Sequence, residues 1–155
     1  MTKYTYIAIG VALIGMVLVV VITMLTLVVE KADTGDSTFV TIDFNSVSVR
    51  SEVVETYFEI SKGLSGRENL AEGDGMLFIF EEVGTHSFWM PDMHFAIDII
   101  WLDESMKVVY IKENATPESY PEKFSPPSPA KYVLEVPTGF SKKWGIVEGT
   151  QAIIR

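Results

Sequence analysis

The 155-residue chain contains no cysteine, and this absence excludes several kinds of chemistry at once. Disulfides, thiolate nucleophiles and cysteine-ligated zinc or iron–sulfur centres all need the missing side chain. Basic residues are also scarce, because 12 lysines and arginines stand against 21 aspartates and glutamates, for a net charge of −9. A phosphate backbone would be repelled by this surplus of acid, so we expect no nucleic acid partner.

The strong catalytic motifs are missing as well. The chain has no Ser-His-Asp order, no phosphate-binding glycine loop and no zinc-protease helix, and it has only two histidines. We therefore expect no cofactor. Whether the protein is an enzyme stays open, and a role other than catalysis is favoured.

Charge is also absent from one long stretch near the start of the chain. Residues 6–29 are 24 in a row without a charged side chain, and 20 of them are hydrophobic. A helix of that length is about 36 Å long, enough to cross a hydrocarbon core of about 30 Å. The sequence thus predicts a membrane anchor over residues 1–30.

The basic residues beside this stretch predict its orientation. Lys3 and the α-amino group precede the stretch and Lys31 follows it, which favours a cytoplasmic N-terminus and an extracytoplasmic domain in a single-pass protein of the cell membrane. A cleaved signal peptide is the alternative, but Val29-Glu30-Lys31 is a poor cleavage site.

After a polar linker at residues 31–37, residues 38–155 have the pattern of a mostly β domain of α+β composition. A capping box at Thr56 and Glu59 predicts a short helix over residues 57–62, and Ser141 is expected to cap a helical turn that ends at Gly145. Strands are predicted at residues 38–44, 47–49, 76–80, 86–90, 96–102, 107–111, 132–136 and 151–154. So many short strands in one small domain indicate a compact β-barrel-like fold.

Several short motifs follow one another in the second half of the chain. They are Gly63-Leu64 with Arg67 and Leu70, Gly75 to Phe80, Phe88-Trp89-Met90, Ile97 to Ile100, Tyr132 to Val136 with Gly139, and Gly145-Ile146 with Gly149. In this order they resemble the DUF192 family (domain of unknown function 192), here with an added N-terminal transmembrane helix. The resemblance implies a barrel-like single domain, commonly exported in prokaryotes, and no established activity.

Two motifs depart from the family pattern. The family reads approximately G-L-M-[FY]-R where this chain has Gly63-Leu64-Ser65-Gly66-Arg67, and F-W-M-K-N-T where it has Phe88-Trp89-Met90-Pro91-Asp92-Met93. If the lost side chains form a site in relatives, this protein binds something else or has kept only the scaffold.

Arg67, Asp98 and Glu135 are the charged residues within the family-like motifs. Each acid interrupts an apolar strand, so it must be paired or face solvent, and Arg67 is a suitable partner. The pair is either a structural ion pair or a catalytic acid with a raised pKa beside a cationic anchor, as in a small hydrolase-like enzyme. Simple exposure is the third possibility.

The two histidines form a weak metal-binding pattern. His86, Asp92 and His94 would share one face of a continuous strand, but Pro91 interrupts that strand and no third His or Cys is available. We therefore predict no metal site.

Aromatic residues gather around Trp89 and in a proline-rich segment, residues 116–130, that is expected to be an extended surface loop. Packing in the core is one explanation for the group around Trp89. Tyr120 and Phe124 lie on the loop, so with Trp89 and Asp92 they are the preferred candidates for a binding surface.

These observations predict a membrane-anchored, extracytoplasmic binding or assembly module. Residues 6–29 would hold the membrane, and the domain would bind a protein partner or a small ligand. The alternatives are a hydrolase-like enzyme using Asp98 or Glu135 with Arg67, and a structural subunit of a larger membrane complex or filament.

Overall fold

The computed structural model describes two separate parts of the chain, residues 15–21 and residues 38–155. Residues 15–21 are helical with exposed side chains. The remainder of the predicted span and the linker at 31–37 lie outside the described residues. In the two described parts, no helix is both long enough and apolar enough to cross a membrane.

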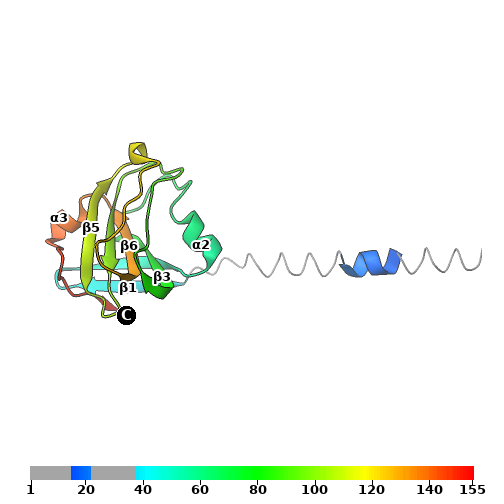
Figure 1. Ribbon diagram of the computed structural model, residues 1–155, viewed down its shortest axis with the longest axis horizontal. Coiled ribbons are helices and arrows are strands. Elements are labelled where there is room, and N and C mark those ends of the chain that lie inside the picture. Colours follow the sequence, from blue (N-terminus) through cyan, green and yellow to red (C-terminus); the bar gives the residue numbers. More distant parts are fainter. Residues whose placement is uncertain (1–14, 22–37) are drawn as a thin grey trace, which may run out of the picture. The chain divides into compact units, whose positions relative to one another are not determined.

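The second part is a mostly β domain built on one seven-stranded sheet (Figure 1). Its strands are β1 (Phe39–Phe44), β2 (Val47–Val54), β3 (Asp74–Gly84), β4 (Ile97–Leu102), β5 (Val108–Ala115), β6 (Ala130–Pro137) and β7 (Ile153–Ile154), and its short helices are α2 (Tyr57–Lys62), η1 (Pro117–Ser119) and α3 (Phe140–Trp144). The strand order is β5-β4-β6-β3-β2-β1-β7. Only β2 and β3 are parallel, and α2 lies in the connection between them.

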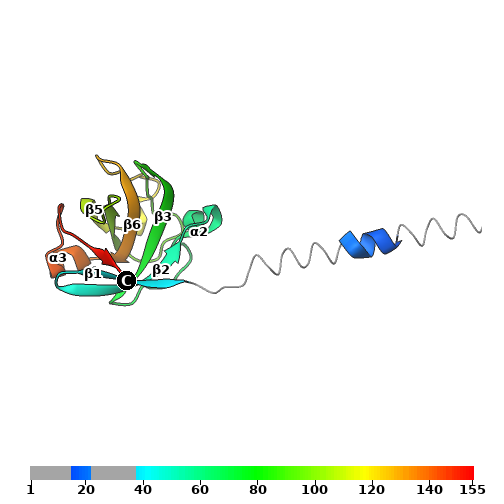
Figure 2. The same cartoon turned by 90° about the horizontal axis from the view of Figure 1, so that it is seen from below.

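The sheet curls into a half-barrel, as Figures 1 and 2 show from two directions. Its two edges are joined by backbone hydrogen bonds, from the amide of Val108 to the carbonyl of Thr150 (2.9 Å) and from the amide of Ala152 to the carbonyl of Met106 (2.9 Å). This joined sheet encloses an inner core that includes Ile42, Val49, Leu77, Ile100, Leu134, Val136 and Phe140.

A second core covers the opposite face of the central strands. We call it the outer core; it includes Val54, Leu64, Met76, Phe78, Phe88, Met93, Ile97, Ile99, Trp101, Phe124 and Val133. Alternate residues of β6 illustrate the division, because Val133 belongs to the outer core while Leu134 belongs to the inner core. The buried acids of these strands, Asp98 and Glu135, are thereby directed to one face of the sheet or the other.

Helix α2 has the capping box that the sequence predicts. The hydroxyl of Thr56 accepts from the amide of Glu59 (3.4 Å), and the carboxylate of Glu59 accepts from the amide of Thr56 (3.0 Å). Gly63 follows the helix with φ of 48°, a backbone conformation that favours glycine. Local sequence is sufficient for this helix because all of its capping contacts lie within four residues.

Three local predictions are wrong. Residues 86–90 do not form a strand, since only Phe88 pairs there, as an isolated bridge to Phe124. Ser141 does not cap α3 but is buried within it, and Gly139 occupies the capping position. The segment 116–130 is not wholly an extended surface loop, because it contains η1 and its Phe124 is buried.

Candidate functional site

A cavity of about 240 Å³ lies over the outer core. One wall comes from α2 and the turn after it, another from residues 86–93, and the sheet contributes residues of β3 and β6. We call it the outer cavity; its lining residues are Ile60, Ser61, Lys62, Gly63, Leu64, Ser65, Phe78, Phe80, His86, Ser87, Phe88, Trp89, Pro91, Met93 and Glu135. The lining is largely apolar and aromatic, with a single carboxyl group.

Strand register puts that carboxyl group, on Glu135, into the outer core. Glu135 of β6 lies opposite Met76 of β3 and Ile99 of β4. Directly opposed residues point to the same face of a sheet, and both neighbours belong to the outer core. The carboxyl group is therefore surrounded by apolar side chains.

Glu135 is 5% exposed, and among the described residues its Oε2 atom has neither a hydrogen-bond partner nor access to solvent. Burial raises the pKa of the Glu135 carboxyl to about 8, although the positive charge of Arg67 acts in the opposite direction. At neutral pH the group is therefore mainly the uncharged acid, which can both donate and accept a hydrogen bond.

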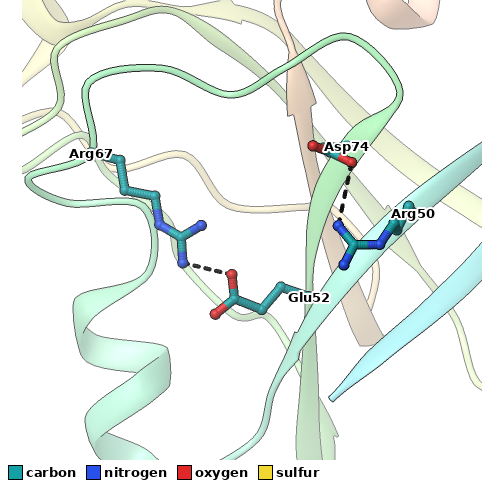
Figure 3. Close-up of polar contacts among 4 residues, drawn as sticks. All are labelled: Arg50, Glu52, Arg67 and Asp74. Atoms are coloured by element: carbon teal, nitrogen blue, oxygen red, sulfur yellow. Dashed lines mark hydrogen bonds and ion pairs between the residues drawn. The ribbon is translucent and has the colours of Figure 1, made fainter. Parts of the chain in front are cut away.

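Arg67 itself is paired with a different carboxylate. Its guanidinium donates to Oε2 of Glu52 at 2.7 Å, as Figure 3 shows, so the expected direct pairing with Asp98 or Glu135 is wrong. Glu52 of β2 lies opposite Met76, which places Glu52, Met76 and Glu135 in one row across three strands. Arg67 acts on Glu135 through its electric field while its own hydrogen bond goes to Glu52.

A second ion pair lies at the start of the same parallel strands. Arg50 of β2 and Asp74 of β3 approach to 3.9 Å, and both side chains are substantially exposed (Figure 3). Exposed pairs at this distance contribute little to stability. Substitution of Arg50 is thus a suitable control for substitution of Arg67, because both arginines pair with a carboxylate but the pair of Arg50 is longer and more exposed.

Asp98 lies on the opposite face of the sheet from Glu135. It pairs with Val136, which belongs to the inner core, whereas Glu135 pairs with Ile99 of the outer core. The alternating direction of neighbouring side chains separates the two acids, so they form no common site.

The role of Asp98 is structural. Its Oδ1 atom accepts from the amides of Asn114 (2.9 Å) and Gly139 (3.1 Å), and its Oδ2 atom accepts from the amide of Ser141 (3.0 Å). Two of these amides belong to the first turn of α3 and its cap. Asp98 therefore supplies, from 43 residues away, the capping contact that was expected of Ser141.

An aromatic pair extends from the outer cavity to the surface. Trp89 lines the cavity and is 42% exposed, and its ring lies 5.5 Å from that of Tyr120, which is 52% exposed. The ammonium group of Lys123 lies 5.4 Å from the centre of the Trp89 ring. Two of the four predicted binding residues thus come together at the edge of a cavity.

Phe124, another of the four, is not a surface residue. It is 6% exposed, belongs to the outer core, and exchanges two backbone hydrogen bonds with Phe88 (2.8 and 2.7 Å). The proline-rich segment is therefore packed against the domain through the buried ring of Phe124.

Asp92, the fourth, lies where the two departures from the family pattern meet. The amide of Gly66 donates to the carbonyl of Asp92 (2.8 Å), and the hydroxyl of Ser65 donates to the carbonyl of Pro91 (2.8 Å). Gly66 has φ of 74° and Asp92 has φ of 51°, so each departs from ordinary backbone geometry. Ser65 and Pro91 both line the outer cavity, so both departures contribute to its wall.

Two residues of the weak metal pattern, Asp92 and His94, lie near each other, and His86 has a different partner. The ring of His86 stacks on Phe80 with centroids 3.6 Å apart, while His94 lies 3.5 Å from Glu68 and 3.9 Å from Asp92. No group of three metal-binding side chains occurs in residues 15–21 and 38–155.

Sequence reasoning missed Glu52. The alternation of β2 carried the signal, because Glu52 lies two residues before the outer-core residue Val54 and so shares its face. The sequence prediction of that strand ended at residue 49, before this alternation could be read.

Comparisons with known proteins agree on the family and the fold. The model of the DUF192 family, described as "Uncharacterized ACR", matches residues 39–154. No curated protein matches the chain.

Two solved structures are similar. One, from Sinorhizobium meliloti 1021, is named as a candidate transcription regulator; it is 26% identical with a TM-score of 0.69, and the match covers 75% of this chain and 92% of that one. The other, a protein of unknown function from Novosphingobium aromaticivorans DSM 12444, is 31% identical with a TM-score of 0.68, covering 76% of this chain and 84% of that one.

Proposed function

Because the chain belongs to the DUF192 family of uncharacterised proteins, we propose a function from its own site: the domain is a binding module that holds a small ligand in the outer cavity. One observation carries the proposal: the buried carboxyl group of Glu135 lines the outer cavity, and its Oε2 atom has no partner in the described domain. An unsatisfied buried polar atom costs about 1–3 kcal/mol, so a ligand that supplies the missing hydrogen bond is favoured. The apolar walls would bury the remainder of the ligand.

The proposal extends to the location of the domain. Residues 6–29 would anchor it in the cell membrane with the N-terminus in the cytoplasm and the domain outside, which their length and the position of Lys3 support. A protein partner and membership of a larger membrane complex or filament stay predictions from the sequence.

Binding is preferred to hydrolysis and to DNA regulation. The hydrolase-like alternative uses Asp98 or Glu135 with Arg67, but Asp98 caps α3 on the other face of the sheet from Glu135, and the guanidinium of Arg67 donates to Glu52 instead. DNA binding, suggested by the description of the S. meliloti protein, is opposed by charge, since residues 38–155 hold 18 acidic and 10 basic side chains.

A screen of small organic compounds tests the proposal. The full chain, labelled at its methionine methyl groups and held in phosphatidylcholine nanodiscs, would be followed by NMR, with Met93 as the reporter because it lines the outer cavity. We expect compounds that bind to shift the Met93 signal. Their affinity should fall at least about tenfold in Ser61→Trp, which places an indole on the cavity lining.

The matched control is Phe58→Trp, on the same helix but exposed and outside the cavity lining. It should leave binding unchanged. If no compound shifts Met93, or if Ser61→Trp binds as well as Phe58→Trp does, the outer cavity is not the binding site.

A further inference from the structure

We propose that the ligand of the outer cavity is a small organic amine, bound as its ammonium ion, with the charged nitrogen on Glu135 and the apolar part against Phe78, Phe88 and Met93. The inference rests on the proposed function and names the chemical class of the ligand.

The carboxyl group of Glu135 is the first argument. Its Oε2 atom is buried and lacks a hydrogen-bond donor in the part of the chain that the structure describes. An alcohol or an ammonium group could donate this bond, but only the ammonium group also neutralises an ionised carboxylate in a site removed from water. Charge-assisted hydrogen bonds are roughly twice as strong as neutral ones.

The walls of the cavity are the second argument. Phe78, Phe80, Phe88 and Trp89 all line it. Phe78 and Phe88 pack edge to face, with ring centres 4.8 Å apart at 90°. Ring faces carry negative electrostatic potential, so an aromatic lining attracts a desolvated cation that an aliphatic lining would not.

The charged groups around Glu135 are the third. The charge of Arg67 is compensated by Glu52 at 2.7 Å, which leaves Glu135 as the carboxyl group without a counter-ion of its own. Lys62 and His86 also belong to the lining, Lys62 on the exposed last turn of α2 and His86 stacked on Phe80. Glu52 is paired with Arg67 and does not line the cavity, so the acidic surplus of residues 38–155, with 18 acidic and 10 basic side chains, is what favours a cation over an anion.

Proton balance follows from this assignment. The free carboxyl group is protonated at neutral pH because its pKa is about 8. When the ammonium ion binds, the O–H bond of Glu135 breaks, its proton passes to solvent, and the carboxylate accepts a hydrogen bond from the ligand. As pH rises toward 8, the affinity for the amine should therefore increase by up to about tenfold per pH unit. Above pH 8 the affinity should level off for as long as the amine stays protonated.

The test compares three probes of nearly the same size, benzylamine, benzyl alcohol and benzoate, on the full chain in phosphatidylcholine nanodiscs. The Met93 methyl signal reports binding, and calorimetry in phosphate and in Tris at pH 7 counts the protons released. We expect benzylamine to bind most tightly, with release of close to one proton, and Glu135→Gln to weaken it by about tenfold or more while still binding benzyl alcohol. Glu113→Gln, an exposed carboxylate on β5, is the matched control and should bind as the wild type does.

The outcomes separate the two proposals. If benzyl alcohol or benzoate binds in the outer cavity as tightly as benzylamine, or if benzylamine binds without proton release, the amine assignment is overturned and the proposed binding function stands. If none of the three probes shifts the Met93 signal, the amine assignment is wrong. The screen of small organic compounds then tests the proposed binding function separately. Proton release is measured on the wild type, so the result does not depend on how well Glu135→Gln folds.

Discussion

Glu52 and Glu135 lie in the same row of the sheet, on either side of Met76, yet their environments differ sharply. Arg67 is hydrogen bonded to Glu52, whereas Oε2 of Glu135 is buried in the outer core without such a partner in the described domain. Of two carboxyl groups about 10 Å apart by strand spacing, one is thus ion paired and the other has an oxygen without a partner in the described domain. The unpaired one is at the cavity.

The first prediction concerns the pH dependence of stability. Glu135 has a pKa of about 8 in the folded domain against an ordinary glutamate pKa of 4.5, so between those values the folded protein binds more protons than the unfolded one. The free energy of unfolding should therefore fall as pH rises from about 5 to 8, by at most about 1.4 kcal/mol per pH unit. Thermal unfolding followed by near-ultraviolet circular dichroism measures this. The slope should be smaller in Glu135→Gln, and an identical slope would contradict the assignment.

The second prediction concerns the field of Arg67. Removing its charge in Arg67→Gln should raise the pKa of Glu135 further, because the lost charge favours the carboxylate. A carbon-13 NMR titration of the glutamate carboxyl groups measures the change. Arg50→Gln removes the neighbouring, more exposed ion pair with Asp74 and should leave Glu135 unaffected (Figure 3). Equal shifts in both variants would mean that the effect is not specific to Arg67.

The third prediction concerns Asp98. Asp98→Asn replaces one accepting oxygen by an amide nitrogen that faces a backbone N–H, so we expect a loss of about 2–4 kcal/mol in the free energy of unfolding. Benzylamine affinity per folded molecule should be unchanged, because Asp98 lies on the other face from Glu135. Asp92→Asn, an exposed control, should keep full stability. A stable Asp98→Asn protein that has lost binding would restore a functional role for this acid.

The fourth prediction concerns Gly75. A Cβ atom there would lie 2.8 Å from Cγ1 of Val49 and 3.0 Å from the backbone oxygen of Glu135. Gly75→Ala should therefore destabilise the domain by about 1–3 kcal/mol, because the sheet has to shift. Gly84→Ala, on the same strand, meets its nearest atom at 3.4 Å, on the ring of His86, and should cost less. Thermal unfolding of the two variants decides between this account and a general cost of alanine in β3.

The fifth prediction concerns the anchor. If residues 6–29 span the membrane, the full chain should stay with membranes after a carbonate wash, and deletion of residues 1–30 should release the domain. Protease added outside intact cells should cleave the domain. Release of the full chain by carbonate would rule out a transmembrane anchor, and protection from external protease would reverse the predicted orientation.

Short-range patterns predicted much of the fold. The helix over residues 57–62 was predicted with its capping box because Thr56 and Glu59 contact each other within one turn. The apolar run at residues 76–80 likewise lies within β3. The strand predicted at residues 86–90 is wrong because the chain there extends across the outer core and pairs only at Phe88, with a residue 36 positions away.

The candidate site was predicted only in part. Glu135, Trp89 and Tyr120 were identified because an acid in an apolar strand and aromatic residues near a loop are unusual in a sequence. How these residues lie relative to one another was not predicted. The direct pairing of Arg67 with Asp98 or Glu135 and the surface position of Phe124 were wrong, whereas the alternative of an acid with a raised pKa near Arg67 fits Glu135. Each error concerns a partner distant in the chain: Glu52 for Arg67, α3 for Asp98 and Phe88 for Phe124.

The sequence by itself determined the mostly β composition, the helix cap, the acidic surplus and the absence of cysteine chemistry, since each depends on residue type or on neighbours a few positions apart. Only the tertiary structure decided which acid is paired, which caps a helix and which faces a cavity. The reason is strand register: β4 places Asp98 opposite Val136 and Ile99 opposite Glu135, and a shift of one residue would exchange their faces. Register depends on contacts between strands that are far apart in the chain, and no local pattern specifies it.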